Sequence, residues 1–225
     1  MSIATAVPPL LQPGQRLTRE EFLRRWEAMP ELKFAELIDG IVYMPSPLSI
    51  DHGDYDSTIS YWLSTYAIAT PGCKSGLNAT WLMSDSAPQP DVHLRILTEF
   101  GGQSGREGKL GAGAPELVVE VCATSAAYDL GPKLKLYQRS GVLEYITLVL
   151  EPGEITWREL VNRRYKPLQP DVTGLLRSSV FPGLWLDPVA ALAGDVARVL
   201  AVLQQGLASE EHAEFVRTLA ARKPS

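Results

Sequence analysis

Hydrophobic residues recur at a helical period in the N-terminal third of the chain, on both sides of a short segment with strand character. The first helical stripe follows Thr18-Arg19-Glu20-Glu21, a capping-box sequence, and ends at Pro30. The second extends from about Asp51 to Pro71-Gly72. Between the two stripes, Asp39-Gly40 separates two hydrophobic segments, which is typical of the tight turn of a β-hairpin. This pattern predicts a helix, a hairpin and a longer helix.

Shorter hydrophobic runs with strand character dominate the middle of the chain. Residues 80–83 and 91–96 are separated by a polar turn, so we expect them to form an antiparallel pair. Residues 117–122 are hydrophobic at every position but one, as in a strand that is buried on both faces. Further extended segments are predicted at 144–150, 155–160 and 175–181.

Two more helical regions complete the pattern. Asp129 is a suitable N-cap for a helix that places Lys133 and Tyr137 on one face and ends at Gly141. From Pro188 to about residue 221 the chain is rich in alanine and leucine, with a break near residues 206–209, where Ser209 can cap the last helix. The order of elements predicts a mixed α/β fold with a central sheet.

A glycine-rich segment lies between the strands, at residues 99–114, and contains six glycines. We expect so flexible a composition not to pack, so the segment is either a mobile flap or, as we favour, a plain insertion. It does not match a phosphate-binding loop, because no Gly-Lys-Ser/Thr follows and the next element is a strand.

Length and composition indicate one main core with a small appendage, since the chain has 225 residues, of which 45% are hydrophobic. We expect an N-terminal tail at residues 1–16 and a main domain at 17–187. Residues 188–225 are expected to form a helical extension that packs on this domain or on a second subunit.

No hydrophobic run approaches the roughly 20 residues of a membrane span, and the N-terminus does not resemble a signal peptide, so the sequence predicts a cytoplasmic protein. The net charge of -5 argues against a broad non-specific nucleic-acid surface but allows a local basic groove. Cys73 and Cys122 have no zinc-ligand spacing and are expected to be buried thiols.

A carboxylate in the middle of a buried strand is the most unusual feature of the sequence. Glu120 interrupts the hydrophobic run 117–122, and an unpaired charge there would cost several kcal/mol, so a cation, a metal ion or a proton must compensate it. Asp91 begins another strand, after Pro90, which favours an extended backbone. Two strands that each carry one carboxylate suggest a divalent-metal site. The alternatives are an internal ion pair for Glu120 and a turn-ending role for Asp91.

Five motifs, in order between residues 17 and 187, resemble the Uma2 family of restriction-endonuclease-like proteins, also called DUF820. They are Glu36-Leu37-Ile38-Asp39-Gly40; Pro45-Ser46-Pro47 with His52; Pro90-Asp91-Val92; Pro115-Glu116-Leu117-Val118-Val119-Glu120-Val121; and Asp129, Lys133, Tyr137, Gly141-Val142 and Glu144-Tyr145. The resemblance implies the PD-(D/E)XK nuclease fold, a mixed sheet flanked by helices in which acids of adjacent strands converge on Mg²⁺ or Mn²⁺.

The resemblance also implies roles for single residues. Asp91 would be the aspartate of the PD element and Glu120 the acid of the (D/E)XK element, and both would bind the metal. Cys122 occupies the place of the motif lysine. The family is similar in having a lysine on the following helix instead, which matches Lys133. Its ammonium group would orient the attacking water, lower the pKa of that water, or stabilise charge on the phosphate.

Three further residues have supporting roles in this interpretation. Glu36 matches an N-terminal acid that would complete the metal shell, and otherwise is an ordinary acid of the hairpin. Tyr137 would support Lys133 or contact the phosphate, and otherwise belongs to the core. His52 lies at the beginning of a helix, where a capping or packing histidine is the more common case.

By resemblance, the chain is expected to be a Mg²⁺-dependent endonuclease of DNA that acts as a homodimer on the duplex. The alternative is an inactive nuclease-fold protein that binds nucleic acid or assists assembly, and an RNase also stays open. The chain departs from the family pattern at Ile146-Thr147-Leu148-Val149 and at Ala123-Thr124-Ser125. Neither departure touches an expected ligand, although an enzyme that is losing its activity would show such changes.

Overall fold

The computed structural model describes residues 8–44, 49–123 and 126–223. The motif Pro45-Ser46-Pro47 and residues 124–125 lie outside the described residues. A six-stranded sheet with the order β11-β10-β9-β8-β5-β3 forms the centre of the molecule. Its strands are β3 (Cys73–Leu77), β5 (Val92–Ile96), β8 (Leu117–Cys122), β9 (Glu144–Val149), β10 (Glu154–Val161) and β11 (Arg164–Pro167).

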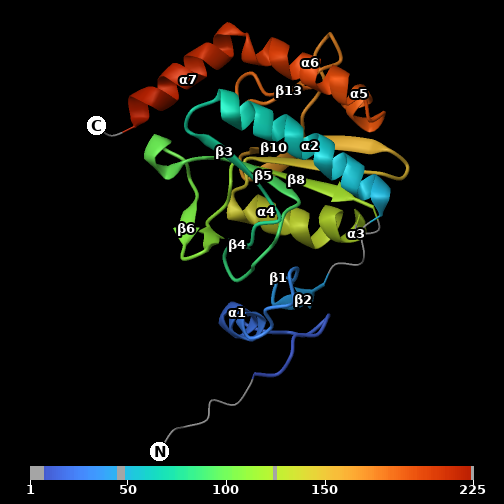
Figure 1. Cartoon of the computed structure of the whole chain (residues 1–225), viewed down its shortest axis with the longest axis vertical. Helices are drawn as coiled ribbons and strands as arrows, with labels where there is room; N and C mark the ends of the chain where they lie inside the picture. Colours follow the sequence, from blue (N-terminus) through green and yellow to red (C-terminus); the bar gives the residue numbers. More distant parts are fainter. Residues whose placement is uncertain (1–7, 45–48, 124–125, 224–225) are drawn as a thin grey trace, which may run out of the picture.

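The sheet is mixed, as predicted, because β8 and β9 are parallel whereas the other neighbouring strands are antiparallel. Helices cover both faces: α2 (Ile50–Ala69) lies on one side, and α4 (Leu134–Ser140) lies on the other (Figure 1). Along β8, Val119 packs in the cluster under α2, and Val118 packs in the cluster under α4. Because side chains alternate along a strand, Glu120 faces the α4 side.

The N-terminal segment forms the predicted helix and hairpin. Thr18 caps α1 (Arg19–Glu27), and its hydroxyl accepts a hydrogen bond from the backbone N–H of Glu21. The hairpin strands β1 (Glu36–Ile38) and β2 (Ile41–Tyr43) are joined by Asp39 and Gly40, whose φ angles are 52° and 76°. Positive φ at both turn residues is what Asp-Gly turns of this type require.

The expectation that the glycine-rich segment does not pack was wrong. It contains a short 3₁₀ helix, η1 (Thr98–Phe100), and two strands, β6 (Gly105–Glu107) and β7 (Leu110–Ala112), which form a small sheet with β4 (Trp81–Leu82). A Cβ atom on Gly111 would lie 2.3 Å from the ring of Trp81, and one on Gly102 would lie 1.9 Å from the carbonyl oxygen of Ile96. These glycines therefore permit close packing, which composition alone cannot distinguish from flexibility.

The expected pairing of residues 80–83 with 91–96 was also wrong. β4 pairs with β7 in parallel, and β5 lies between β3 and β8. The edge strand β3 had not been predicted, because Lys74 and Gly76 interrupt any hydrophobic alternation. Gly76 is required there, since a Cβ atom would lie 2.4 Å from the ring of His93.

Short elements and three helices complete the chain. Ser209 caps the last helix, as predicted, and Asp195 caps the helix before it at an additional break. Val199, Leu203 and Leu219 of these helices are buried in the same cluster as α2. The remaining elements are α3 (Ala126–Tyr128), a π-helical turn η2 (Asp129–Lys133), β12 (Leu176–Arg177), β13 (Trp185–Leu186), α5 (Pro188–Leu192), α6 (Val196–Leu207) and α7 (Glu210–Arg222).

None of the described helices combines the length and the hydrophobicity that crossing a membrane requires.

Candidate metal centre

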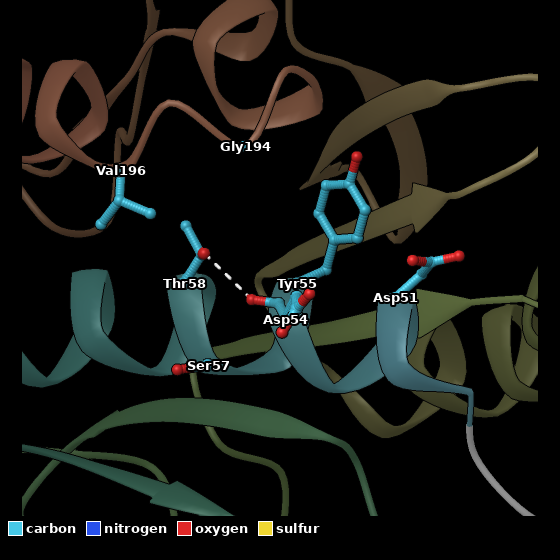
Figure 2. A pocket seen from close by; sticks show the side chains of 7 residues that line it. All are labelled: Asp51, Asp54, Tyr55, Ser57, Thr58, Gly194 and Val196. Carbon is cyan, nitrogen blue, oxygen red and sulfur yellow. Dashed lines mark hydrogen bonds between the residues drawn. The ribbon is translucent and has the colours of Figure 1, made fainter.

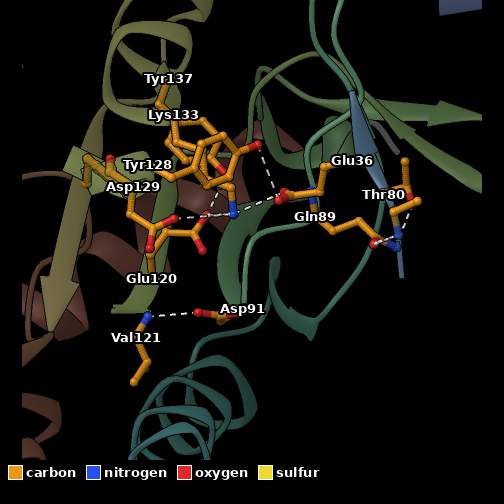
Figure 3. Close-up of polar contacts among 12 residues, drawn as sticks. Glu36, Thr80, Gln89, Asp91, Glu120, Val121, Tyr128, Asp129, Lys133 and Tyr137 are labelled. Atoms are coloured by element: carbon orange, nitrogen blue, oxygen red, sulfur yellow. Dashed lines mark hydrogen bonds and ion pairs between the residues drawn. The ribbon is translucent and has the colours of Figure 1, made fainter. Parts of the chain in front are cut away.

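Lys133 lies at the centre of a buried group of carboxylates (Figure 3). Its Nζ atom is 2.9 Å from Oε1 of Glu120, 3.0 Å from Oε1 of Glu36 and 3.7 Å from Oδ1 of Asp129. The side chain of Lys133 is only 5% exposed, so this ion-pair network is largely removed from solvent. The sequence had left an ion pair open as the alternative for Glu120, and this pair is present.

A π-helical turn brings Asp129 and Lys133 to the network. The sequence predicted Asp129 as an N-cap, which was wrong, because the helical segment already includes Ala126–Tyr128 and Asp129 is buried within it. Pro132 lies inside this turn and cannot donate the backbone hydrogen bond of a regular α-helix, which suits the wider π geometry. Asp129 thereby faces Lys133, the residue four positions later.

Tyr137, one helical turn after Lys133, also contacts Glu120. Its hydroxyl donates a hydrogen bond of 2.7 Å to Oε1 of Glu120, the oxygen that Lys133 also contacts. The spacing of four residues between Lys133 and Tyr137 thus places both side chains on one carboxylate, as expected of one helical face. Among the described residues, hydrogen bonds to the side chain of Glu120 reach only Oε1.

Glu36 links the N-terminal hairpin to this network. Its Oε1 atom accepts a hydrogen bond of 2.6 Å from the backbone N–H of Gln89, and its Oε2 atom lies 3.5 Å from the hydroxyl of Tyr128. Gln89 immediately precedes Pro90-Asp91. The hairpin acid is therefore tied to the segment that leads into β5.

Asp91 lies where the ladder between β5 and β8 ends. In this ladder Val92 is opposite Val119, so the next position along places Asp91 beside Glu120. The Oδ2 atom of Asp91 accepts a hydrogen bond of 2.8 Å from the backbone N–H of Val121. This N–H lies beyond the last residue pair of the β5–β8 ladder, so the carboxylate supplies the acceptor that a strand would otherwise provide. The two acids that the sequence singled out come from neighbouring strands, but Lys133 pairs with Glu120 and not with Asp91.

The cluster holds more negative than positive charge. Burial raises the pKa of Asp91 to about 6, although Lys133 acts in the opposite direction. Burial also raises the pKa of Glu120 well above its usual range, again against the effect of Lys133. For Lys133 itself burial lowers the pKa, but the surrounding carboxylates outweigh it and hold the pKa well above the usual value. The four carboxyl groups of Glu36, Asp91, Glu120 and Asp129 thus outnumber the one ammonium group of the cluster.

His52 lies beside Asp91. It belongs to the first turn of α2, where its backbone N–H donates to Oγ of Ser49, and its Nε2 atom is 3.2 Å from Oδ2 of Asp56. One ligand atom from each of His52, Asp56 and Asp91 lies within 4.8 Å of the others, a spacing that could hold a metal ion.

Sequence reasoning missed Asp56 and the inward position of Asp129. A usable signal existed in both cases, because Asp56 is four residues from His52 and Asp129 is four residues from Lys133. Side chains at this spacing are neighbours on a helix.

A surface pocket on the other side of α2 is separate from these acids. It is lined by Asp51, Asp54, Tyr55, Ser57, Thr58, Gly194 and Val196 (Figure 2). Its polar side chains come from helix positions that do not include His52 or Asp56. The pocket therefore does not give access to the carboxylate cluster.

Comparison with known proteins identifies proteins of similar fold and the family of this chain. The chain resembles a crystal structure from Anabaena variabilis, described as "a putative nuclease belonging to DUF820", with a TM-score of 0.57 and 15% sequence identity. The match covers 83% of this chain and 99% of that one, and at this identity it shows the shared fold. No curated protein matches the chain. The sequence profile of Uma2, described as "Putative restriction endonuclease", matches residues 19–190, and the chain therefore belongs to the Uma2 family.

Proposed function

We propose that this protein is a divalent-metal-dependent endonuclease that hydrolyses phosphodiester bonds of DNA. Asp91 and Glu120 would bind Mg²⁺ or Mn²⁺, Glu36 would complete the metal shell, and Lys133 would act at the phosphate. The observation that carries the proposal is the burial of Glu120 and Glu36 against Lys133, with Asp91 beside Glu120 on the neighbouring strand β5.

The donor types suit a hard divalent cation, but joint binding by Glu36, Asp91 and Glu120 would require these side chains to move. Among the described residues, only His52, Asp56 and Asp91 already have ligand atoms within 4.8 Å of one another. Carboxylate oxygens are the ligands that Mg²⁺ prefers, and it usually binds through one or two of them together with substrate phosphate. Burial raises the pKa of Asp91, and a bound metal ion would supply positive charge to this carboxylate in place of a proton. When bound, such an ion would acidify a water molecule and withdraw charge from the scissile phosphate.

The side chains of the network would position this chemistry. Tyr137 and Lys133 both hold Oε1 of Glu120, which fixes the carboxylate and directs its second oxygen to another ligand. Lys133 has three N–H donors, of which Glu120 and Glu36 engage two at short distance. The third donor is suited to a phosphate oxygen or to the attacking water. His52 would support the site through Asp91.

The test is nicking of supercoiled plasmid DNA by purified variants in the presence of Mg²⁺ or Mn²⁺. We expect Asp91→Asn and Glu120→Gln each to lower the rate by about 10²-fold or more, since each would remove a metal ligand. Glu144→Gln is the matched control, because Glu144 is also a buried sheet glutamate but hydrogen-bonds Ser178, outside the network. Equal nicking by wild type and both site variants, with folding verified by circular dichroism, would refute the assignment.

One observation favours the second candidate, an inactive nuclease-fold protein that binds nucleic acid or assists assembly. The carboxylate of Glu120 is already compensated by Lys133 and Tyr137, without a metal ion. DNA binding by wild type without cleavage under any divalent ion would support this candidate. Cleavage that depends on Glu120 would exclude it.

The proposed substrate is duplex DNA and the proposed working form is a homodimer, because two strands of a duplex are well matched by two copies of one site. Cleavage assays with matched DNA and RNA duplexes separate a DNase from an RNase. Sedimentation of the protein with and without DNA tests whether it is a homodimer. A monomer that cuts both strands of the duplex at a rate independent of protein concentration would contradict the homodimer.

A further inference from the structure

We infer that His52, Asp56 and Asp91 form a second cation site, on the α2 side of Asp91, that takes a first-row transition-metal ion in preference to Mg²⁺. The site shares Asp91 with the proposed nuclease centre but involves neither Glu120 nor Lys133. Its metal binding can be measured separately from the nuclease activity.

The spacing of the three side chains fits one ion. A ligand atom from each residue lies within 4.8 Å of the other two, and Nε2 of His52 is 3.2 Å from Oδ2 of Asp56. Two ligands with metal bonds of about 2.0 to 2.3 Å lie at most about 4.6 Å apart on the same ion. Small side-chain adjustments are therefore sufficient to close the site.

The hydrogen-bonding state of His52 is the second observation. His52 is only 5% exposed, yet its Nε2 atom has no hydrogen-bond partner among the described residues. The contact with Asp56 Oδ2 is short but lacks the direction of a hydrogen bond, and Oδ1 of Asp56 is likewise buried without a partner. Buried polar atoms in native proteins are normally satisfied, so these atoms indicate a missing ligand.

The ligand set determines the class of ion. A buried imidazole with two carboxylates resembles the mixed nitrogen and oxygen sites of first-row transition metals, whereas Mg²⁺ prefers oxygen ligands alone. The order of affinities for such sites places Zn²⁺ and Co²⁺ above Mn²⁺. The position of each group follows from the fold: α2 supplies His52 and Asp56 one helical turn apart, and the start of β5 supplies Asp91.

The test is titration of the full-length, metal-free protein with Co²⁺, followed by visible absorption, and with Zn²⁺, followed by calorimetry. We expect His52→Gln and Asp56→Asn each to weaken binding at this site by at least about tenfold and to remove its Co²⁺ band. Asp54→Asn is the matched control, because Asp54 is an exposed aspartate of the same helix that lines the pocket on the other side. Glu120→Gln should keep the Co²⁺ band.

A measurement on the unmutated protein guards against variants that fail to fold. Zn²⁺ should shift the ¹⁵N resonance of His52 Nε2 and leave those of His93 and His212 in place. Unchanged Co²⁺ binding in both variants, an unaffected His52 resonance, or displacement of Zn²⁺ by equimolar Mg²⁺ would each overturn the inference and leave an ordinary histidine–aspartate pair.

The outcomes separate this inference from the proposed function. Loss of nicking in Glu120→Gln without any metal effect on His52 contradicts only the second site. Co²⁺ binding that needs His52, in a wild-type protein that cleaves no DNA, contradicts only the nuclease proposal.

Discussion

At the residue scale, one buried ammonium group is the centre of the carboxylate network. Lys133 contacts Glu120 and Glu36 at about 3 Å and faces Asp129 at 3.7 Å. Each of these acids comes from a different element, so the lysine joins the hairpin, the central sheet and the π-helical turn. In a buried network of this kind the loss of one partner costs more than the pair itself contributes.

Replacing Lys133 tests this dependence. We expect Lys133→Met to lower the free energy of unfolding by about 3 to 5 kcal/mol, because it leaves buried carboxylates without their cation. Chemical denaturation at pH 7.5 measures the change, and added Mn²⁺ should restore part of it. Lys135→Met, at an exposed position of α4, the helix that follows the π-helical turn, should change stability by less than about 0.5 kcal/mol. Equal stabilities for the two variants would contradict the buried network.

Glu144 is a second buried acid whose charge depends on pH. It is fully buried at the start of β9 and accepts hydrogen bonds from Ser178 Oγ and the backbone N–H of Ser179. Burial outweighs these bonds and raises the pKa of Glu144 to about 7 from its ordinary value of 4.5. The folded protein therefore holds this proton more tightly than the unfolded chain, so the contribution of Glu144 to stability falls as the pH rises from about 4.5 to about 7.

The variant Glu144→Gln removes this titration. It should resemble wild type in stability near pH 4.5 and exceed it by up to about 3 kcal/mol at pH 8, where the wild-type carboxylate is charged. Urea denaturation of both proteins across this range gives the difference directly. A difference that does not change with pH would show that Glu144 is not protonated in the folded protein near neutrality.

At the element scale, the small sheet of β4, β7 and β6 shows how glycine can serve packing. A Cβ atom at Gly102 would lie 1.9 Å from the backbone oxygen of Ile96, so no side chain fits there without movement of the main chain. Gly105, three residues later, has its first neighbour at 3.8 Å, the hydroxyl of Thr98. The same segment therefore contains one restrictive and one permissive position.

This contrast gives a matched pair of variants. We expect Gly102→Ala to destabilise the protein by about 1 to 3 kcal/mol or more through overpacking, and Gly105→Ala to have an effect below about 0.5 kcal/mol. Thermal unfolding of the two proteins tests both values. If the segment were an unpacked insertion, as its composition suggests, both substitutions would be tolerated.

At the scale of the whole molecule, the C-terminal helices belong to the same hydrophobic cluster as the central sheet. Val199, Leu203 and Leu219 are fully buried with Trp62 of α2, and the indole N–H of Trp62 donates to the carbonyl of Trp185. Figure 1 shows α6 and α7 lying over α2 on the outer side. The region that extends beyond the family motifs therefore contributes to the main core.

Truncation of one side chain tests this coupling. Leu203→Ala should lower the free energy of unfolding by about 2 to 5 kcal/mol and keep a single cooperative transition. Val189→Ala, at a position that is 75% exposed on α5, is the control and should be close to neutral. A separate early transition in the Leu203 variant would instead indicate that the C-terminal helices unfold on their own.

The sequence by itself determined the features that depend on near neighbours. Thr18 predicted a helix cap, Asp39-Gly40 predicted a hairpin turn, and residues 117–122 predicted a buried strand. These features were predictable because capping, turn geometry and side-chain alternation depend on residues a few positions apart. The spaced motifs also identified the family, and they proposed Asp91, Glu120 and Lys133 as site residues.

Only the tertiary structure decided which distant segments meet. The pairing of β5 with β3, the contact of Gly111 with Trp81, and the approach of His52 to Asp91 join residues that no local pattern connects. Such contacts depend on the shape and burial of both partners, and a linear pattern contains neither. The network around Lys133 is of this kind, since its charge balance arises only when the hairpin, the sheet and the π-helical turn are assembled.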